Sequence, residues 1–317
     1  MRDRKKTFHH IPVLGHETMQ YLLRTDGPGN YFDCTLGGGG HSRMILEAHP
    51  ENRIFACDVD DQALQAAHSN LAEFGDRFQS IRNNFGELAN SARALEIPPG
   101  SLDGILMDIG VSSHQLDMPQ RGFAYGQDGP LDMRMDRRLT RTASHLLNEE
   151  SEKELRRIFK VYGEERQAGR IARAVVTDRE TKKWERTSEF AEMVTRIVGR
   201  SKKGQAPAPA RTFQALRIAV NQELDVLENG LKAAFELLKP GGHLVVITFH
   251  SLEDRIVKHF FKELAEGDQG DPRMPIPVNV RDPEGKLLTR KPVIASEEER
   301  KENPRANCSK LRAIEKF

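Results

Sequence analysis

Short apolar runs alternate with amphipathic stretches along much of the chain. Five runs rich in β-branched and other apolar residues predict strands: 31–36, 54–60, 77–84, 104–110 and 243–251. Apolar residues recur with helical spacing between them, for example at 61–74 and 85–95, and a last strand is predicted within 309–317. Strands that alternate with helices are typical of a parallel sheet covered on both faces. The pattern therefore predicts an α/β fold.

One interval is too long for this alternation. About 130 residues separate the strand at 104–110 from the strand at 243–251, whereas a single crossover unit needs roughly 30. The interval predicts helices at 151–160, 164–177, 187–198 and, beyond a polar link at 199–210, a long helix near 212–238. We therefore expect a helical domain at 116–211, inserted between the two parts of the α/β domain at 1–115 and 212–317.

The net charge of +1 hides an uneven distribution. Residues 134–211 carry 20 lysines and arginines against 12 aspartates and glutamates, a net charge of +8, so the remainder has a net charge of −7. A basic segment of this size is typical of a surface that faces a polyanion such as RNA, although a solvated helical surface with i,i+4 ion pairs has a similar composition. The candidate phosphate contacts are Lys182, Lys183, Lys202 and Lys203, together with Arg134, Arg137 and Arg138.

Other features limit the class of protein. No run approaches the ~20 apolar residues of a transmembrane helix, and the basic N-terminus lacks the apolar core of a secretory signal. The three cysteines, Cys34, Cys57 and Cys308, form no CxxC pair, which favours buried thiols over a disulfide or a zinc site. We expect a cytoplasmic protein without a membrane partner or a bound metal.

The stretch YFDCTLGGGGHS, residues 31–42, places four glycines after the first predicted strand. Glycine loses the most backbone freedom on folding, so such a run implies that something approaches the backbone closely. The P-loop pattern is excluded because no lysine follows, and the dinucleotide pattern GxGxxG fails because its third glycine falls on Ser42 or Arg43. In an open α/β sheet, the loop after the first strand is the usual ligand cradle.

Asp58 ends the second predicted strand, 18 residues after Gly40. A carboxylate at this position can accept hydrogen bonds from both hydroxyls of a ribose. Together with a glycine loop unsuited to pyrophosphate, it indicates a nucleoside ligand such as S-adenosylmethionine, with the methionine part against the glycines. A tight structural turn beside a surface aspartate is the alternative.

Asp108 ends the fourth predicted strand, at the sheet edge that carries the glycines. Methyl transfer needs mainly alignment of a nucleophile with the sulfonium and exclusion of water. If the nucleophile is an exocyclic amine, Asp108 can accept a hydrogen bond from it as positive charge develops. A helix cap or turn is the structural alternative for Asp108. After the fifth strand, Ser251 and Asp254 predict a capping box, and His250 is a further candidate for the site.

Longer motifs are distributed nearly end to end. They are HIPVL, TLGGGGHS, DGILMDIGVSS, RGFAYGQDGPLDMRMD, YGEERQAGRIARAV, RTFQALRIAVNQEL, TFHSLEDRIVK and NPRANCSKLR. In combination they resemble the small-subunit ribosomal RNA methyltransferase H family, formerly called MraW, whose members methylate the exocyclic amine of a cytosine in the bacterial decoding region. His114 and Gly15 depart from the proline and leucine that are usual in that family.

The resemblance implies a Rossmann-like S-adenosylmethionine-dependent methyltransferase sheet, and RNA recognition by the inserted domain. The cofactor contacts that it implies are Gly39, Gly40, His41, Asp58, Phe85, Asp108 and Gln115, with Asp108 also the candidate catalytic group. It implies ribosomal RNA or the small ribosomal subunit as partner, and it leaves the oligomeric state, monomer or homodimer, open. From the residues alone, His41 lacks the histidine or cysteine partners of a metal site, and Phe85 is equally suited to the core.

Three functions remain in competition. The first, which we favour, is methylation of a cytosine in 16S ribosomal RNA with S-adenosylmethionine as donor. The second is a nicotinamide-dependent oxidoreductase, which the missing third glycine disfavours. The third is a non-catalytic RNA-binding or assembly protein, which the basic segment alone would allow.

Overall fold

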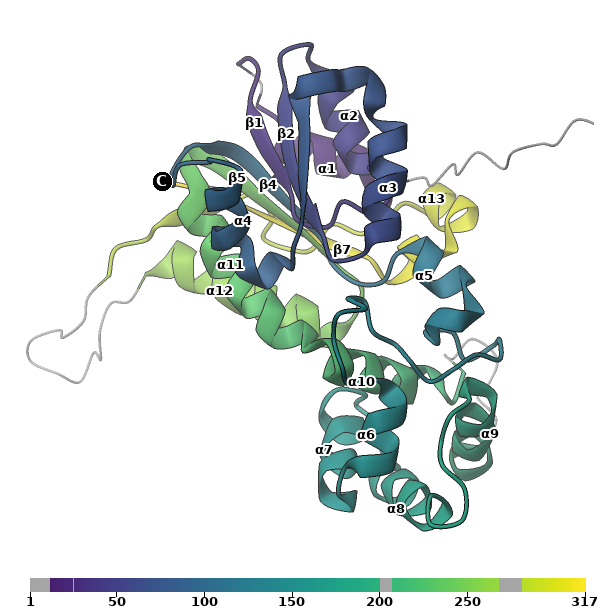
Figure 1. The fold of residues 1–317 in the computed structure, drawn as a ribbon. Helices are drawn as coiled ribbons and strands as arrows, with labels where there is room; N and C mark the ends of the chain where they lie inside the picture. Colours follow the sequence, from purple (N-terminus) through teal and green to yellow (C-terminus); the bar gives the residue numbers. More distant parts are fainter. Residues whose placement is uncertain (1–11, 25, 200–206, 268–280) are drawn as a thin grey trace, which may run out of the picture. The chain divides into compact units, whose positions relative to one another are not determined.

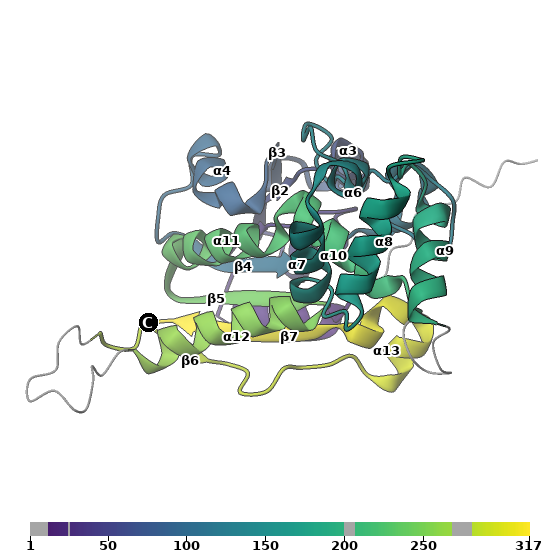
Figure 2. The same ribbon diagram turned by 90° about the horizontal axis from the view of Figure 1, so that it is seen from below.

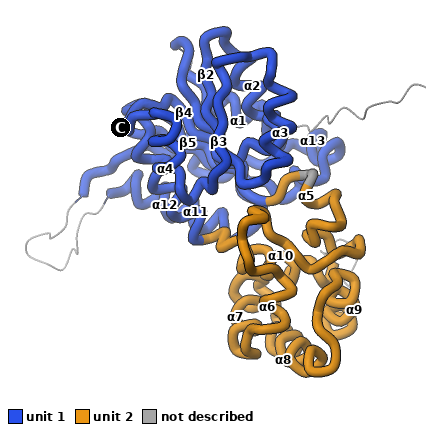
Figure 3. The backbone as a smooth tube through the Cα atoms, viewed as in Figure 1, with its two compact units in different colours: residues 1–110, 225–317 blue, residues 111–224 orange. Residues whose placement is uncertain are grey.

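The computed structural model describes residues 12–24, 26–199, 207–267 and 281–317. The chain divides into two compact units, unit 1 at 1–110 and 225–317 and unit 2 at 111–224 (Figure 3). Unit 2 is an insertion in unit 1, because the chain leaves unit 1 after Gly110 and returns to it at Asp225. Its bounds differ from the predicted insert at 116–211 mainly on the C-terminal side, where 212–224 belong to unit 2.

The described residues of unit 1 form a seven-stranded sheet (Figure 1). Its strands are β1 (Asn30–Asp33), β2 (Arg53–Asp58), β3 (Phe78–Arg82), β4 (Leu102–Asp108), β5 (Leu238–Thr248), β6 (Gly285–Leu287) and β7 (Lys310–Lys316). They lie in the order β3-β2-β1-β4-β5-β7-β6. Neighbours from β3 to β5 are parallel, whereas β7 runs antiparallel to β5 and β6. The predicted α/β fold is confirmed, and the short β6 is the strand that the pattern did not predict.

Helices cover both faces of this sheet (Figures 1 and 2). They are α1 (Gly15–Leu22), α2 (Gly40–Ala48), α3 (Asp61–Asn70), α4 (Leu88–Ala94), α11 (Glu223–Leu237), α12 (Ser251–Glu266) and α13 (Glu297–Glu302). One face packs against α1, α2 and α3, which bury residues such as Ile45 and Leu46. The other packs against α4, α11 and α12, which bury residues such as Leu231 and Phe261. The near-continuous apolar sequence of β4 follows from this double coverage.

Unit 2 is helical in its described residues. Its helices are α5 (Ser113–Asp117), α6 (Ala143–Glu149), α7 (Glu152–Val161), α8 (Ala168–Asp178), α9 (Thr187–Val198) and α10 (Ala210–Asn221). The core is aromatic at its centre, where the Phe190 ring stacks on Phe159 and contacts Trp184 and Phe213. α7, α8 and α9 correspond to three predicted helices, although α8 begins at Ala168 rather than at 164. Among the helices described in either unit, none is long and apolar enough to cross a membrane.

The prediction of one long helix near 212–238 is wrong. Gln222 has a φ of 51°, a left-handed conformation that a continuous α-helix does not contain, so the segment divides into α10 and α11. α10 buries Phe213 and Leu216 in the core of unit 2, whereas α11 buries Leu231 against the sheet of unit 1. The break allows one segment to supply apolar residues to two separate cores.

The expectation of buried thiols is met only in part. Cys34 and Cys57 are buried free thiols as predicted, whereas Cys308 is exposed because it ends a short surface 3-10 turn, Pro304–Cys308. Residues 200–206 of the predicted polar link and 268–280 before β6 lie outside the described residues.

Candidate functional site

The glycine turn, residues 37–40, joins β1 to α2 at the carboxyl edge of the sheet. Gly37 and Gly39 have φ values of 50° and 80°, a region that residues with a Cβ rarely adopt. The turn is anchored from β2, because the Gly37 N–H donates to Asp58 Oδ2 at 2.8 Å. Backbone conformation therefore accounts for glycine at positions 37 and 39 without reference to a ligand.

Gly38 and Gly39 differ in what a side chain would meet. A Cβ at Gly39 would lie 3.0 Å from Leu71 Cδ1 and 3.5 Å from Ala67 Cβ, so this glycine allows the turn to pack on α3. A Cβ at Gly38 would meet, among the described atoms within 4 Å, Asn70 Nδ2 at 4.0 Å, and Gly38 has no positive φ. The local fold requires glycine at position 39 but not at position 38, where the bare backbone has room beside it.

Asp58 ends β2 beside this turn. Besides the Gly37 N–H at Oδ2, its carboxylate accepts the Asp60 N–H at Oδ1, at 2.9 Å. Burial raises the pKa of the Asp58 carboxyl to about 6, although the two backbone hydrogen bonds act to lower it. Each oxygen retains a second lone pair, so the carboxylate can still accept ribose hydroxyls. The anchoring of the glycine turn is an additional role that the sequence did not reveal.

His41, in the first turn of α2, is buried and neutral. Its Nε2 lies 3.0 Å from the carbonyl oxygen of Val13, so Nε2 carries the proton and donates to that oxygen. Burial lowers the pKa of the imidazole to about 4. Nδ1 therefore presents a lone pair, and it lies 3.7 Å from Asp108 Oδ2. The structure thus brings His41 beside Asp108, as a neutral neighbour.

Asp108 ends β4 at the same edge of the sheet. Its backbone N–H donates to Thr35 Oγ1 at 2.7 Å, which ties the end of β4 to the segment that follows β1. Its Oδ1 is buried and has no hydrogen-bond partner among the described residues. Burial, and then the charges of Asp33 and Glu253, raise the pKa of the Asp108 carboxyl to about 8. A buried carboxyl with an unpaired oxygen and a strongly shifted pKa is a marker of a functional site.

Asp33 is an acid of the site that the sequence reasoning missed. It is the last residue of β1, and it accepts the Thr35 N–H at 3.0 Å and the Ser42 hydroxyl at 2.8 Å. Burial raises its pKa. A signal was available, because the neighbouring strands β1, β2 and β4 end in Asp33, Asp58 and Asp108 respectively. Parallel neighbours carry their last residues to the same sheet edge.

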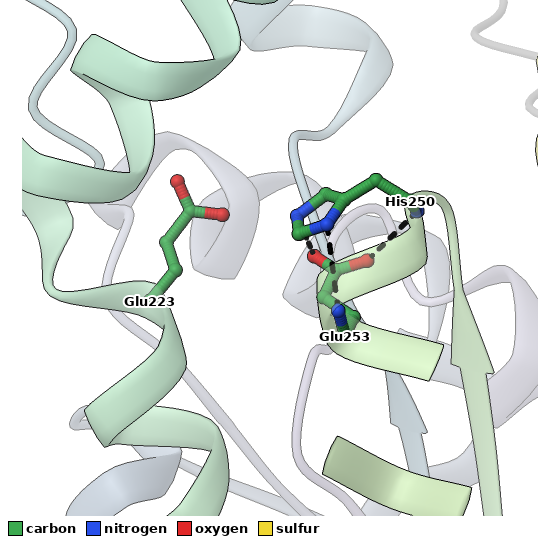
Figure 4. Close-up of side chains that lie close together, drawn as sticks. All are labelled: Glu223, His250 and Glu253. Carbon is green, nitrogen blue, oxygen red and sulfur yellow. Dashed lines mark hydrogen bonds and ion pairs between the residues drawn. The ribbon is translucent and has the colours of Figure 1, made fainter. Parts of the chain in front are cut away.

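Glu253 is the second missed acid, and it holds the turn from β5 into α12 (Figure 4). Its Oε2 accepts the N–H groups of Phe249 and His250 at 2.9 and 3.2 Å, and its Oε1 lies 2.9 Å from His250 Nε2. His250 Nδ1 in turn accepts the Glu253 N–H, which completes a capping box. Glu223, the third residue drawn, belongs to unit 2 and pairs with Arg217 at 2.8 Å.

The capping box predicted for Ser251 and Asp254 is wrong. The N-cap of α12 is His250 rather than Ser251, so the third helical residue that completes the box is Glu253. Asp254 instead pairs with Lys310 at 3.1 Å and with Arg312 at 2.7 Å, both on β7. The sequence could not reveal these partners because they lie more than fifty residues further along the chain.

Phe85 and Gln115 have structural roles that the sequence left open. Phe85 follows β3 and packs on α11, since a Cβ at Gly230 would lie 2.7 Å from Phe85 Cδ2. Gln115 belongs to unit 2, where it is 4% exposed and its Oε1 accepts the Ser112 N–H in the capping box of α5. The cofactor contacts of both residues stay predictions.

Unit 1 therefore gathers Asp33, Asp58 and Asp108 on adjacent strands, with the charge of Glu253 close enough to act on Asp108. In the part of the chain that the structure describes, no lysine or arginine pairs with these three aspartates. Carboxylates repel phosphate, so the edge is unsuited to pyrophosphate, and it favours a cationic ligand with hydroxyl donors. S-adenosylmethionine, with a sulfonium, an ammonium and two ribose hydroxyls, fits this set of groups.

Comparison with known proteins agrees with this chemistry. A model of the MraW methylase family matches residues 7–317. Ribosomal RNA small subunit methyltransferase H of Symbiobacterium thermophilum is 49% identical over 312 residues, which cover 98% of this chain and 97% of that protein. The protein of the same name from Heliobacterium modesticaldum is also 49% identical over 312 residues, covering 98% and 99% of the two chains. The chain therefore belongs to the MraW methylase family.

Proposed function

We propose that this protein transfers the methyl group of S-adenosylmethionine to the exocyclic amine of a cytosine in 16S ribosomal RNA, in the decoding region of the small subunit. The family relationship and the name that its relatives share support the reaction class and the RNA substrate. The structural observation that carries the proposal is Asp108, a buried strand-end carboxyl with an oxygen that no described residue hydrogen-bonds. The reaction belongs in the cytoplasm, where ribosomal subunits are assembled.

The glycine turn and Asp58 are the proposed cofactor contacts. Gly38, Gly39 and Gly40 would lie against the methionine part, and Asp58 would accept the ribose hydroxyls. Hydrogen bonds to a charged group are worth roughly 1.5–3 kcal/mol each. S-adenosylmethionine supplies, when bound, a methyl group on a sulfonium that is already activated for transfer. Phe85 would contact the adenine, and the family resemblance also assigns His41, Asp108 and Gln115 to the cofactor contacts.

Asp108 Oδ1 would accept a hydrogen bond from the amine that is methylated. The amine nitrogen would gain positive charge as its lone pair forms the new bond to the methyl carbon while the bond from that carbon to sulfur breaks, and its proton would then pass to the carboxylate that accepts its hydrogen bond. A carboxylate oxygen without another donor strengthens this hydrogen bond most when that charge is greatest. The pKa of the Asp108 carboxyl is about 8 in the protein without a ligand, and a cation nearby lowers it, so that the carboxylate forms. His41 is neutral, so it does not pair with that carboxylate as a cation.

The test is methyl transfer from labelled S-adenosylmethionine to 16S RNA, offered both free and within assembled small subunits. Mass spectrometry of RNA from cells with and without the protein should map one methyl group to the exocyclic amine of a cytosine. S-adenosylhomocysteine should raise the melting temperature of the protein, and a nicotinamide cofactor should not. Unmethylated RNA in both arms, with stabilisation by the nicotinamide cofactor alone, would overturn the proposal in favour of the oxidoreductase.

A further inference from the structure

Unit 2 carries a cluster of exposed cations on α7, on α8 and in the segment between them. The cluster, which we call the α7–α8 basic face, consists of Lys153, Arg156, Lys160, Arg166 and Arg170. All five side chains are exposed, and within the described residues none of them forms an ion pair. Arg170 donates to the carboxamide of Gln167, which is neutral. Lys153 acts electrostatically on Glu154, the acid that pairs with Arg157, but no acid among the described residues forms an ion pair with any of the five cations.

Helical spacing and packing bring these cations to one surface. On α7, Lys153, Arg156 and Lys160 are three and four residues apart, so they share a side of the helix. α7 turns its apolar residues into the core that it shares with α8. A Cβ at Gly169 would lie 3.7 Å from Arg156 Nε, so the Arg156 side chain crosses to the first turn of α8, beside the residue that precedes Arg170.

Other arginines of unit 2 are paired with acids. The pairs are Arg134–Asp132, Arg138–Asp136, Arg141–Glu150, Arg157–Glu154 and Arg186–Asp128. The contrast is clearest on α7 itself, where Arg157 pairs with Glu154 at 2.7 Å and its neighbour Arg156 pairs with no acid that the structure describes. The other acid of the first turn, Glu152, lies 3.8 Å from Arg173 rather than on the basic face. The acids of α7 are thus engaged elsewhere.

Of the seven phosphate contacts expected from the sequence, three form ion pairs, whereas Lys183 and Arg137 are exposed and form none among the described residues. Lys182 pairs with Glu189, and Arg134 and Arg138 are engaged by their own loop. Lys202 and Lys203 lie outside the described residues. A solvated surface with paired charges was the alternative that the sequence left open. It holds for much of unit 2, including Arg157 and Arg173 on α7 and α8, but not for the five cations of the basic face.

Like charges on one surface repel, and an extended anion relieves that repulsion. Guanidinium groups bind phosphate oxygens through paired hydrogen bonds, and a row of cations suits a chain of phosphates. We propose that the α7–α8 basic face binds the phosphate backbone of the RNA substrate. The identity of that RNA rests on the proposed function, whereas the surface does not. A membrane fits less well, because interfacial binding needs a row of exposed apolar side chains beside the cations. On α7 the exposed large apolar side chain is Val161 alone, since Leu155, Ile158 and Phe159 are buried.

The test replaces Arg156, Lys160 and Arg170 together with glutamine in the full-length protein. The matched control replaces three exposed lysines of unit 1 that form no ion pair among the described residues, namely Lys232, Lys258 and Lys286. Both variants lose three positive charges. Affinity for 16S RNA and for polyuridylate is measured at several salt concentrations. The slope of log affinity against log salt should fall by about 2 in the basic-face variant, at roughly 0.7 per contact with a single strand. The control should keep the wild-type slope.

Further readouts separate this inference from the proposed function. If the wild-type protein methylates RNA, the basic-face variant should raise KM for RNA at least tenfold while kcat and the affinity for S-adenosylhomocysteine stay unchanged. If the wild-type protein methylates no RNA, the proposed function fails, but a reduced slope with polyuridylate still supports the basic face. A wild-type slope in the folded variant, or an equal loss in the control, would overturn the inference. The inference would also be overturned if the basic-face variant lost binding to phosphatidylserine vesicles while its RNA binding stayed unchanged.

Discussion

The glycine turn offers a sharp test because two adjacent glycines meet different surroundings. Gly39→Ala adds a Cβ at a residue with a φ of 80°, and places it 3.0 Å from Leu71 Cδ1. The left-handed conformation costs an alanine roughly 1–2 kcal/mol, and an overpacked methyl group costs roughly 1–3 kcal/mol. We expect Gly39→Ala to lower the free energy of unfolding by about 2–5 kcal/mol, the sum of these terms. Gly38→Ala meets neither penalty and should leave stability unchanged or raise it by roughly 0.4–1 kcal/mol.

Cofactor affinity should separate the two glycines in a different way. If the methionine part of the cofactor lies against the turn at Gly38, an added methyl group occupies space that the ligand needs. Gly38→Ala should then weaken binding of S-adenosylhomocysteine at least tenfold, or about 1.4 kcal/mol. Urea denaturation reports stability and titration calorimetry reports affinity, with Gly126→Ala as a control at an exposed glycine that has open space around it. A stable Gly38→Ala protein with normal affinity would refute this reasoning and leave the turn a purely structural feature.

Three further predictions concern the acids. Asp58→Ala should weaken S-adenosylhomocysteine binding by roughly 1.5–3 kcal/mol per hydroxyl contact and abolish any preference over the 2′-deoxy analogue; a preserved preference in calorimetry would show that Asp58 does not bind the ribose. Asp108→Asn should abolish methyl transfer. The folded protein holds the Asp108 proton up to about pH 8, whereas the unfolded chain releases it near pH 4. The free energy of unfolding of the wild type therefore falls as pH rises between these values. The Asp108→Asn variant should therefore be more stable than the wild type above pH 8 and lose that advantage toward pH 5. Chemical denaturation across pH measures this, and parallel curves of unfolding free energy against pH for the two proteins would contradict it. Glu253→Gln removes a charge that raises the pKa of Asp108, so that pKa, followed by carboxyl NMR shifts, should fall; an unchanged value would exclude the electrostatic coupling.

The sheet could be predicted because its strands are buried on both faces and are apolar along their length. The division at Gln222 could not be predicted from the same kind of pattern. α10 and α11 each have helical periodicity, and glutamine is a good helix former, so the local sequence favours one continuous helix. The break arises because the apolar residues on its two sides belong to different cores, which is a tertiary constraint.

The site could be predicted as a set of residues but not as a coupled system. Asp58 and Asp108 were visible as strand-end acids. Their raised pKa values depend first on burial and then on the charges of acids elsewhere in the chain, such as Asp33 for both and Glu253 for Asp108. The glycine run indicated that another group approaches the backbone closely. It did not indicate that the packing of Leu71 on α3 by itself requires glycine at position 39.

The acids at this edge have an energetic consequence for turnover under the proposed function. Asp33, Asp58 and Asp108 have raised pKa values, so the folded protein without a ligand is less stable as they ionise. A bound cation offsets that penalty, and S-adenosylmethionine carries one more positive charge than S-adenosylhomocysteine. Methyl transfer removes the sulfonium charge, so the same carboxylates stabilise the bound substrate more than the bound product. The acid cluster would therefore bind the substrate form of the cofactor more tightly than the product form, which favours release after the reaction.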